Sequence, residues 1–191
     1  MRKVTLIFGL LSGAIISMFM ILGLLLFETG VMTTDFSELV GYGTMVIALS
    51  MIFFGIKSYR DNYQKGAIGF WKGIQVGLLI SLIASLMYAL TWETYMQSRP
   101  ASAATFMEKY TESVINKMKE KGASADKIEQ EIKKMDDKMK MYRNPVFRFG
   151  ITILEILPVG IVITLISAAL LRKKELLPAQ HFEPNNPRLE T

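Results

Sequence analysis

The stretch VTLIFGLLSGAIISMFMILGLLLF, residues 4–27, contains no charged side chain. As an α-helix rising about 1.5 Å per residue it is roughly 36 Å long, more than the bilayer hydrocarbon core of about 30 Å. It therefore predicts a transmembrane helix. Arg2 and Lys3 precede it, as in a secretory signal peptide, but the apolar part is too long and no small-x-small cleavage site follows Phe27. We expect the segment to be retained.

Three further apolar stretches follow along the chain, and they are residues 39–56, 73–92 and 149–171. Only the last contains an acidic residue, Glu155. Hydrophobic residues make up 51% of the 191 positions and charged residues 20%, a composition too apolar for an ordinary soluble domain. We predict an all-α integral membrane four-helix bundle, with spans 1 to 3 within residues 1–98 and span 4 within residues 146–174.

The charges beside the spans predict their orientation, because Lys and Arg in short loops stay on the cytoplasmic side. Basic residues lie before the first span, between the second and third, and after the fourth: Arg2, Lys3, Lys57, Arg60, Lys65, Lys72, Arg172, Lys173 and Lys174. The loop between the first and second spans contains Glu28, Asp35 and Glu38 and no basic residue. We therefore expect both termini in the cytoplasm. The proline-rich residues 175–191, which include the single histidine, His181, are predicted to be a disordered cytoplasmic tail.

Residues 99–145 are predicted to form an extracytoplasmic helical hairpin between spans 3 and 4. Apolar residues recur there at steps of three and four, in two groups: Phe106, Tyr110, Val114 and Met118, then Ile128, Ile132, Met135, Met139 and Tyr142. Gly122 and Ser124 suit the turn between the two helices. Thr105 and Glu108 have the spacing of a capping box, which predicts the start of the first helix.

Three roles for this hairpin are open, and we favour the first. Its two narrow apolar stripes pack against each other; or it lies on the outer membrane surface; or it presents a docking face to a partner. Nucleic acid is not an expected partner, because the ten basic and eight acidic residues between Ser102 and Arg143 alternate in sign and form no basic stripe.

Small residues recur every fourth position in two spans, which is typical of close helix packing within lipid. In span 3 these are Gly69, Gly73, Gly77, Ser81 and Ser85, and in span 1 they are Gly9, Gly13 and Ser17. We favour contacts within one chain; contacts between subunits of a homo-oligomer are the alternative.

Glu155 is the leading functional candidate, because an ionised carboxylate inside a span costs at least a few kcal/mol. Pro158 follows three residues later and removes a backbone donor, which can kink the helix. One reading makes Glu155 a neutral acid that hydrogen-bonds to Gln75, Ser81, Ser85 or Tyr88 on span 3. The other makes Glu155 and Pro158 part of a transport or proton path.

No catalytic signature is present. The chain lacks cysteine and has one histidine, so thiolate and most imidazole chemistry is excluded, and no phosphate loop, His-Glu-x-x-His, Gly-x-Ser-x-Gly or dinucleotide fingerprint occurs. We expect no enzyme activity, cofactor or metal. Trp92 and Tyr95 lie near a span end and are predicted interface anchors.

The order of these elements resembles an uncharacterised family of small four-span bacterial membrane proteins, defined only as a domain of unknown function. The stretches GASADKIEQEIKKMDDKMKMYRNPVF and EILPVGIVITLISAALLRKKE carry the resemblance, which covers roughly residues 4–175. The residues most like its signature are Asn144, Pro145, Glu155, Pro158 and Gly160. The resemblance implies the architecture and a bacterial inner-membrane location, and it transfers no catalytic residue.

From the sequence we therefore expect a non-enzymatic membrane protein that acts through assembly, with the hairpin as its outward contact element. The expected partners are the lipid bilayer and either another membrane protein or a second copy of the chain. The alternative is a small transporter or channel component that uses Glu155 and the Pro158 kink.

Overall fold

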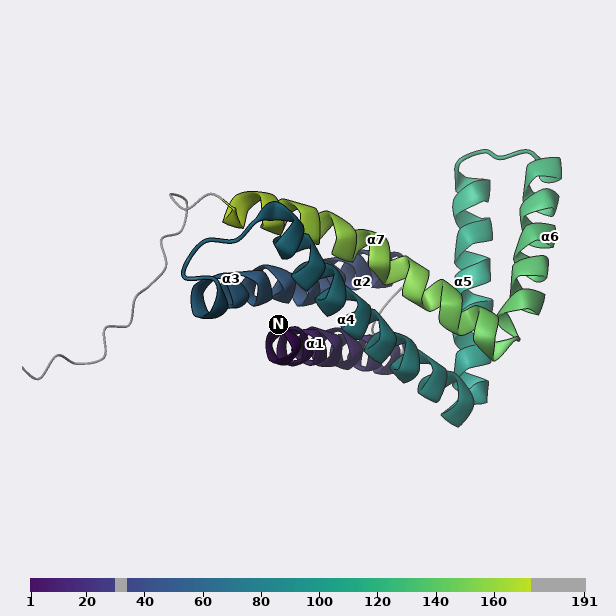
Figure 1. The fold of residues 1–191 in the computed structure, drawn as a ribbon. Helices are drawn as coiled ribbons and strands as arrows, with labels where there is room; N and C mark the ends of the chain where they lie inside the picture. The colour runs from purple at the N-terminus through teal and green to yellow at the C-terminus, as the bar shows by residue number, and fades with distance from the viewer. Residues whose placement is uncertain (30–33, 173–191) are drawn as a thin grey trace, which may run out of the picture.

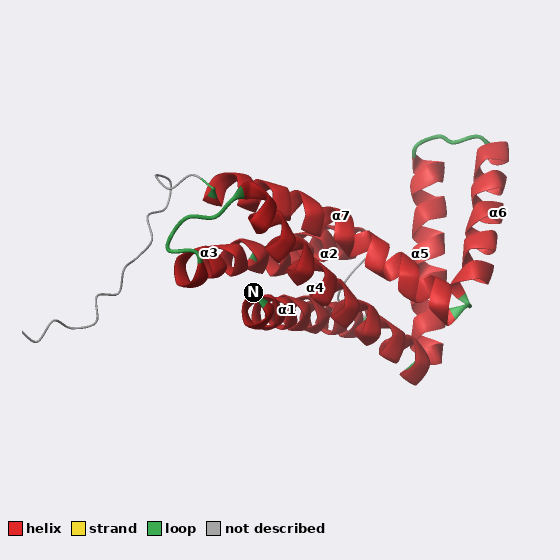
Figure 2. Cartoon of the chain, viewed as in Figure 1, coloured by secondary structure: helices red, strands yellow, loops and turns green. Residues whose placement is uncertain are grey.

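The computed structural model describes residues 1–29 and 34–172, with only the backbone for residues 34–38. These residues form seven α-helices: α1 (Arg2–Glu28), α2 (Thr34–Leu49), α3 (Met51–Tyr63), α4 (Phe70–Ser98), α5 (Pro100–Glu120), α6 (Ala125–Tyr142) and α7 (Pro145–Leu171). Every described element is helical (Figure 2). The predicted tail with His181 lies outside the described residues, as do Lys173 and Lys174 and the side chains of Asp35 and Glu38.

Four stretches are long and apolar enough to cross a bilayer, and they are Arg2–Glu28, Leu39–Tyr63, Phe70–Ser98 and Pro145–Leu171. Their mean hydropathies lie between 1.9 and 2.5. The protein is therefore a multi-pass membrane protein, and the predicted all-α class with four spans is confirmed. Each helix extends beyond its charge-free core; the third, predicted over 73–92, begins at Phe70 and ends at Ser98.

The second span differs from its prediction, because it consists of two helices that meet at Ser50. The Ser50 hydroxyl donates to the Ile47 carbonyl over 2.6 Å, and the Ser50 amide lies 3.0 Å from the Val46 carbonyl. A serine hydroxyl that competes for a helical carbonyl interrupts the helix locally. The backbone of Ser50 stays helical, with φ −59° and ψ −21°, so the chain continues across the membrane in one direction to Tyr63.

The central helix of the bundle is α4, which contacts α1, α3 and α7. Branched apolar side chains fill the space between these helices: Ile16, Ile52, Ile56, Ile80 and Ile156 are each at most 2% exposed. Many leucines on the outer faces remain exposed, as lipid-facing positions in a bilayer protein do. Because the exposed outer face is apolar as well as the buried inner face, the bundle is suited to a hydrocarbon surrounding.

The hairpin of α5 and α6 stands across one end of the bundle, where α4 ends and α7 begins (Figure 1). Its turn contains Gly122 with φ +71°, a left-handed conformation that favours glycine. The predicted capping box is wrong, because α5 already begins at Pro100, and the Thr105 hydroxyl donates to the Ala101 carbonyl within the helix. Proline supplied the stronger start signal, since its fixed φ suits the first helical position.

Candidate functional site

The α4–α7 interface is built from small residues on both helices. Three glycines lie so close to the other helix that an added Cβ would stand within 3.0 Å of one of its side chains, and the pairs are Gly73–Ala168, Gly77–Thr164 and Gly160–Ser81. Each step of four residues along α4 matches a step of four back along α7, so the two helices are antiparallel in one constant register. Small side chains allow this approach, and the resulting dispersion contacts hold helices together within lipid.

The α1–α4 interface uses a parallel register on another face of α4. A Cβ on Gly9 would lie 2.7 Å from Ile83, and one on Gly13 would lie 2.8 Å from Met87. One turn farther, the Thr91 hydroxyl donates to the Ser17 hydroxyl over 3.1 Å. The small residues of span 1 and of span 3 thus pack within the chain, but on different neighbours. Gly69 has no atom within 4 Å of its Cβ position.

The same α4–α7 register also brings Glu93 opposite Arg148. Glu93 lies three steps of four residues after Ser81, and Arg148 lies three such steps before Gly160. The Arg148 guanidinium donates to both carboxylate oxygens, Nη2 to Oε1 over 2.6 Å and Nε to Oε2 over 2.8 Å. Only 9% of the arginine side chain and 15% of the glutamate side chain are exposed. Gln97 donates a further bond to Glu93, and the Tyr142 carbonyl accepts one from Arg148. A bidentate pair with its remaining groups bonded fixes geometry strongly.

The hairpin is attached to the bundle at this pair. The indole N–H of Trp92 donates to the Tyr142 hydroxyl over 2.9 Å, and the Trp92 ring makes an edge contact with Phe106 of α5. Burial raises the pKa of the Tyr142 phenol, although the hydrogen bond from the Trp92 indole lowers it in part, and the hydroxyl stays protonated. We call Trp92, Glu93, Tyr142 and Arg148 the hairpin-base cluster, which joins α4, α6 and α7.

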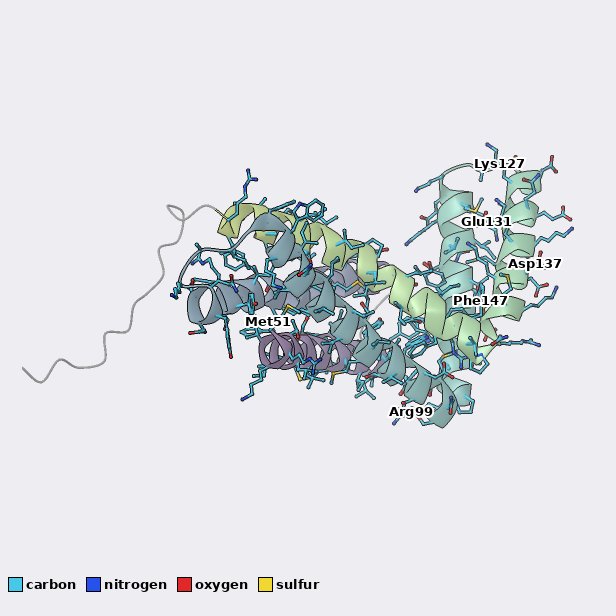
Figure 3. All side chains as sticks on the ribbon, viewed as in Figure 1. Met51, Arg99, Lys127, Glu131, Asp137 and Phe147 are labelled. Carbon is cyan, nitrogen blue, oxygen red and sulfur yellow. The ribbon has the colours of Figure 1, made fainter. Side chains whose placement is uncertain are left out.

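A second contact joins the hairpin end of α1 to the junction of α4 and α5. The Glu28 carboxylate accepts from the Tyr95 hydroxyl over 3.1 Å and from the Arg99 guanidinium over 2.9 Å. Phe27 makes an edge contact with Phe106, at a centroid separation of 5.1 Å. The base of α5 is thereby held against α1 as well as α4. The labelled Arg99 lies at the α4–α5 junction in Figure 3.

The residues of the predicted polar site do not form one hydrogen-bonded group. The Ser81 and Ser85 hydroxyls donate to carbonyls of their own helix, those of Gly77 and Ser81. Gln75 is exposed, and its amide oxygen accepts from Lys72 over 3.3 Å. Glu155 and Pro158 are exposed on α7, and Glu155 lies close enough to Tyr88 of α4 for the two side chains to interact electrostatically, with no hydrogen bond between them among the described residues. Tyr88, half-buried, packs against the apolar core.

Residues 7–173 of the chain match a family model that is described as a protein of unknown function (DUF4199). The chain belongs to the DUF4199 family. The predicted resemblance to a family of unknown function is confirmed in this form, and the match spans all four membrane helices and the hairpin. Neither the curated proteins nor the solved structures contain a significant match to this DUF4199 chain.

The described residues of this DUF4199 protein contain no group of three or more histidine, aspartate or glutamate side chains placed to hold a metal ion. What they do contain is an arrangement of hydrogen-bonding and charged groups concentrated at one end of the bundle. These groups hold the hairpin on the bundle through a buried ion pair and the Trp92–Tyr142 bond, and they leave charged side chains of the hairpin exposed.

Sequence reasoning did not single out Glu93 and Arg148, although a signal for them exists. Glu93 continues the four-residue spacing of Gly73, Gly77, Ser81 and Ser85, and Arg148 lies a multiple of four before Gly160. The two opposite charges therefore end complementary faces of two antiparallel spans. Trp92 was predicted as an interface anchor, but it is only 8% exposed and its indole bonds to the hairpin.

Proposed function

We propose that this DUF4199 protein is a non-enzymatic membrane protein that acts by assembly, with the α5–α6 hairpin as its contact element for another membrane protein. The observation that carries the proposal is the hairpin-base cluster. A loop that only connected two spans would need no buried bidentate ion pair at its base. Here Arg148 and Trp92 hold the hairpin in one direction, and a fixed direction is what a docking element requires.

The faces of the hairpin support the same role. The two hairpin helices contact each other, and each covers part of the apolar stripe of the other. The half-buried residues of these stripes include Val114, Met118, Met135 and Met139. Most charged residues of the hairpin remain exposed, Lys127 and Asp137 among them, whereas Glu131 is half-buried. These side chains carry both signs, and charge patterns of this kind select partners more than they add affinity.

The proposed setting is a bacterial inner membrane, with the hairpin outside and both termini in the cytoplasm. The charge distribution supports this orientation. Lys57, Arg60 and Arg172 lie at the bundle end opposite the hairpin, and Arg2 and Lys3 begin α1 at that end. When basic residues are concentrated in the short loops at one end of a bundle, that end is the cytoplasmic side.

Transport through a path containing Glu155 and Pro158 is the alternative function, and it has less support. Glu155 is exposed and lines no described pocket, and one turn farther along α7 the α4–α7 interface is closed by Gly160 against Ser81. A Glu155→Gln protein in proteoliposomes is expected to conduct protons no differently from the unchanged protein. Loss of a measurable proton flux in that variant would favour transport over assembly.

Site-specific photo-crosslinking in native membranes tests the assembly role. A photoreactive amino acid replaces Asp137 on the hairpin in one protein and Trp71, which is 76% exposed at the other end of the bundle, in the matched control. We expect position 137 to yield a discrete adduct with one other protein that position 71 does not yield. Equal labelling at both positions, or adducts with lipid alone, would contradict the proposed role.

A further inference from the structure

A groove of about 460 Å³ runs along the surface between α1 and α4, on the hairpin half of the bundle. Its inner part is apolar and formed by Ile21 and Leu25 of α1 with Met87 and Leu90 of α4. Its outer part is polar and includes Thr94, Ser98 and Arg99. The volume lies within the roughly 300–1,000 Å³ of small-molecule sites, and the two parts are arranged as an apolar tail and a polar head would require.

The length of the groove matches one leaflet of a bilayer. Met87 and Arg99 are 12 positions apart in the chain, which corresponds to about 18 Å along a helix. Half of a hydrocarbon core of about 30 Å is roughly 15 Å. With Arg99 at the end of the third span, the polar part of the groove lies at headgroup level and the apolar part ends near the bilayer midplane.

Arg99 lines the polar end of the groove, and its ion-pair partner Glu28 lies beside it, next to the groove lining. Arg99 is half-exposed and uses one of its five N–H donors on Glu28, whose side chain is 28% exposed. A phosphate is the natural acceptor for the accessible part of a guanidinium, and a primary ammonium is a natural donor to a carboxylate. A purely anionic headgroup would meet the Glu28 carboxylate and be repelled. A quaternary ammonium has no N–H to donate.

We propose that the α1–α4 groove binds one phospholipid whose headgroup has a phosphate and a primary ammonium, a phosphatidylethanolamine. The phosphate bonds to Arg99, the ammonium lies beside Glu28, and an acyl chain follows the groove past Leu90 to Met87. The bound lipid would then fill the surface between α1 and α4 directly below the base of the hairpin. This site is separate from the hairpin faces and does not depend on the assembly role.

Native mass spectrometry of the full chain in detergent tests the proposal. Equimolar phosphatidylethanolamine, phosphatidylglycerol and phosphatidylcholine with the same acyl chains are added together. We expect the ethanolamine lipid to remain bound preferentially over each of the others. Equal retention of the three lipids, or preferential retention of phosphatidylglycerol, would overturn the proposal, and this comparison needs no variant to fold.

Two variants test which residues give the preference for the ethanolamine lipid. Arg99→Gln is expected to reduce retention of the ethanolamine lipid about three- to tenfold, the range for losing an ordinary hydrogen bond, because solvent at the half-exposed guanidinium weakens the charge-assisted bond. Glu28→Gln leaves the arginine charge uncompensated and is expected to reverse the order in favour of phosphatidylglycerol. Arg143→Gln, which removes an exposed arginine outside the groove, is the matched control. An equal loss in that control would assign the binding to general surface charge and contradict the site.

Discussion

The two ends of α4 are joined to their neighbours by opposite kinds of chemistry. Between Gly73 and Ser81, the helix meets α7 through glycine, alanine, threonine and serine. There the close approach of the two helices stabilises their contact through dispersion. At Glu93 the same two helices meet through a buried ion pair. Lipid cannot drive apolar helices together by the hydrophobic effect, so the inner part depends on packing. At the hairpin end polar groups are available, and directional bonds set the geometry.

One helical register between α4 and α7 provides both the close packing and the ion pair. Because every fourth residue of α4 faces α7, close packing of the small residues also determines that Glu93 meets Arg148. The membrane part thus positions the hairpin through a shared register. Changes at either end test whether the two parts depend on each other.

The largest effect is expected from Arg148→Gln, which leaves Glu93 mostly buried without its cation. Removing one member of a buried pair costs about 3–5 kcal/mol, and we expect the lower end of that range because the pair lies near a membrane surface. Thermal unfolding in detergent measures the loss. The double variant Glu93→Gln with Arg148→Gln should recover part of it, since no unpaired charge remains. A double variant less stable than the single one would contradict this account of the pair.

A smaller effect is expected from Gly77→Leu, which places a side chain where a Cβ alone would stand 2.5 Å from Thr164. Overpacking of this kind costs about 1–3 kcal/mol. The matched control is Gly23→Leu in α1, where nothing lies within 4 Å of the Cβ position. Unfolding in detergent should separate the two variants clearly. If both lower the unfolding temperature equally, the close approach of α4 and α7 is not what stabilises the bundle.

Trp92→Phe tests the attachment of the hairpin more gently. The ring contact with Phe106 is retained and the bond to the Tyr142 hydroxyl is lost, at a cost of about 1 kcal/mol. Tyr142→Phe removes the same bond from the other side, together with the hydrogen bond between the Tyr142 and Thr152 side chains. Limited proteolysis of the hairpin should rise at least as much for Tyr142→Phe as for Trp92→Phe, and combining the two should give no further rise beyond that of Tyr142→Phe. Additive effects would show that the two residues act separately.

The smallest effect is expected from Lys140→Gln. Lys140 contacts Asp136 over 2.8 Å on α6, and the two side chains are each 63% exposed. Both carboxylates, Asp136 and Asp137, raise the pKa of the lysine, but exposed pairs contribute little to stability. The unfolding temperature should be unchanged within error. A drop as large as that for Trp92→Phe would mean that the charged faces of the hairpin stabilise it directly.

Much of the fold could be predicted because its signals are local. Runs without charge gave the four spans, and Gly122 indicated the hairpin turn. The Ser50 interruption was not predicted, because a serine within an apolar run is usually tolerated in a membrane helix. The start of α5 was misplaced because two start signals compete within six residues, and Pro100 outweighed Thr105.

The candidate site was harder to predict, because it depends on which helix faces which. Glu155 was the leading candidate because it is the one acid inside a predicted span, yet its side chain is exposed and makes no hydrogen bond to the predicted partners on α4. Glu93 and Arg148 lay just outside the charge-free stretches, where single charges are common. Nothing in the local sequence says that these two are partners.

The amino-acid sequence by itself determined how many times the chain crosses the bilayer and that a charged hairpin lies between the last two crossings. These properties follow from the transfer free energy of each segment, which depends on its own composition. The order of the crossings also fixes that α4 runs parallel to α1 and antiparallel to α7, but the tertiary structure alone decided that α4 packs between these two helices and in which register, and hence that Glu93 meets Arg148. Such pairings depend on the shapes of surfaces far apart in the chain, and side-chain spacing within one helix does not name its neighbour.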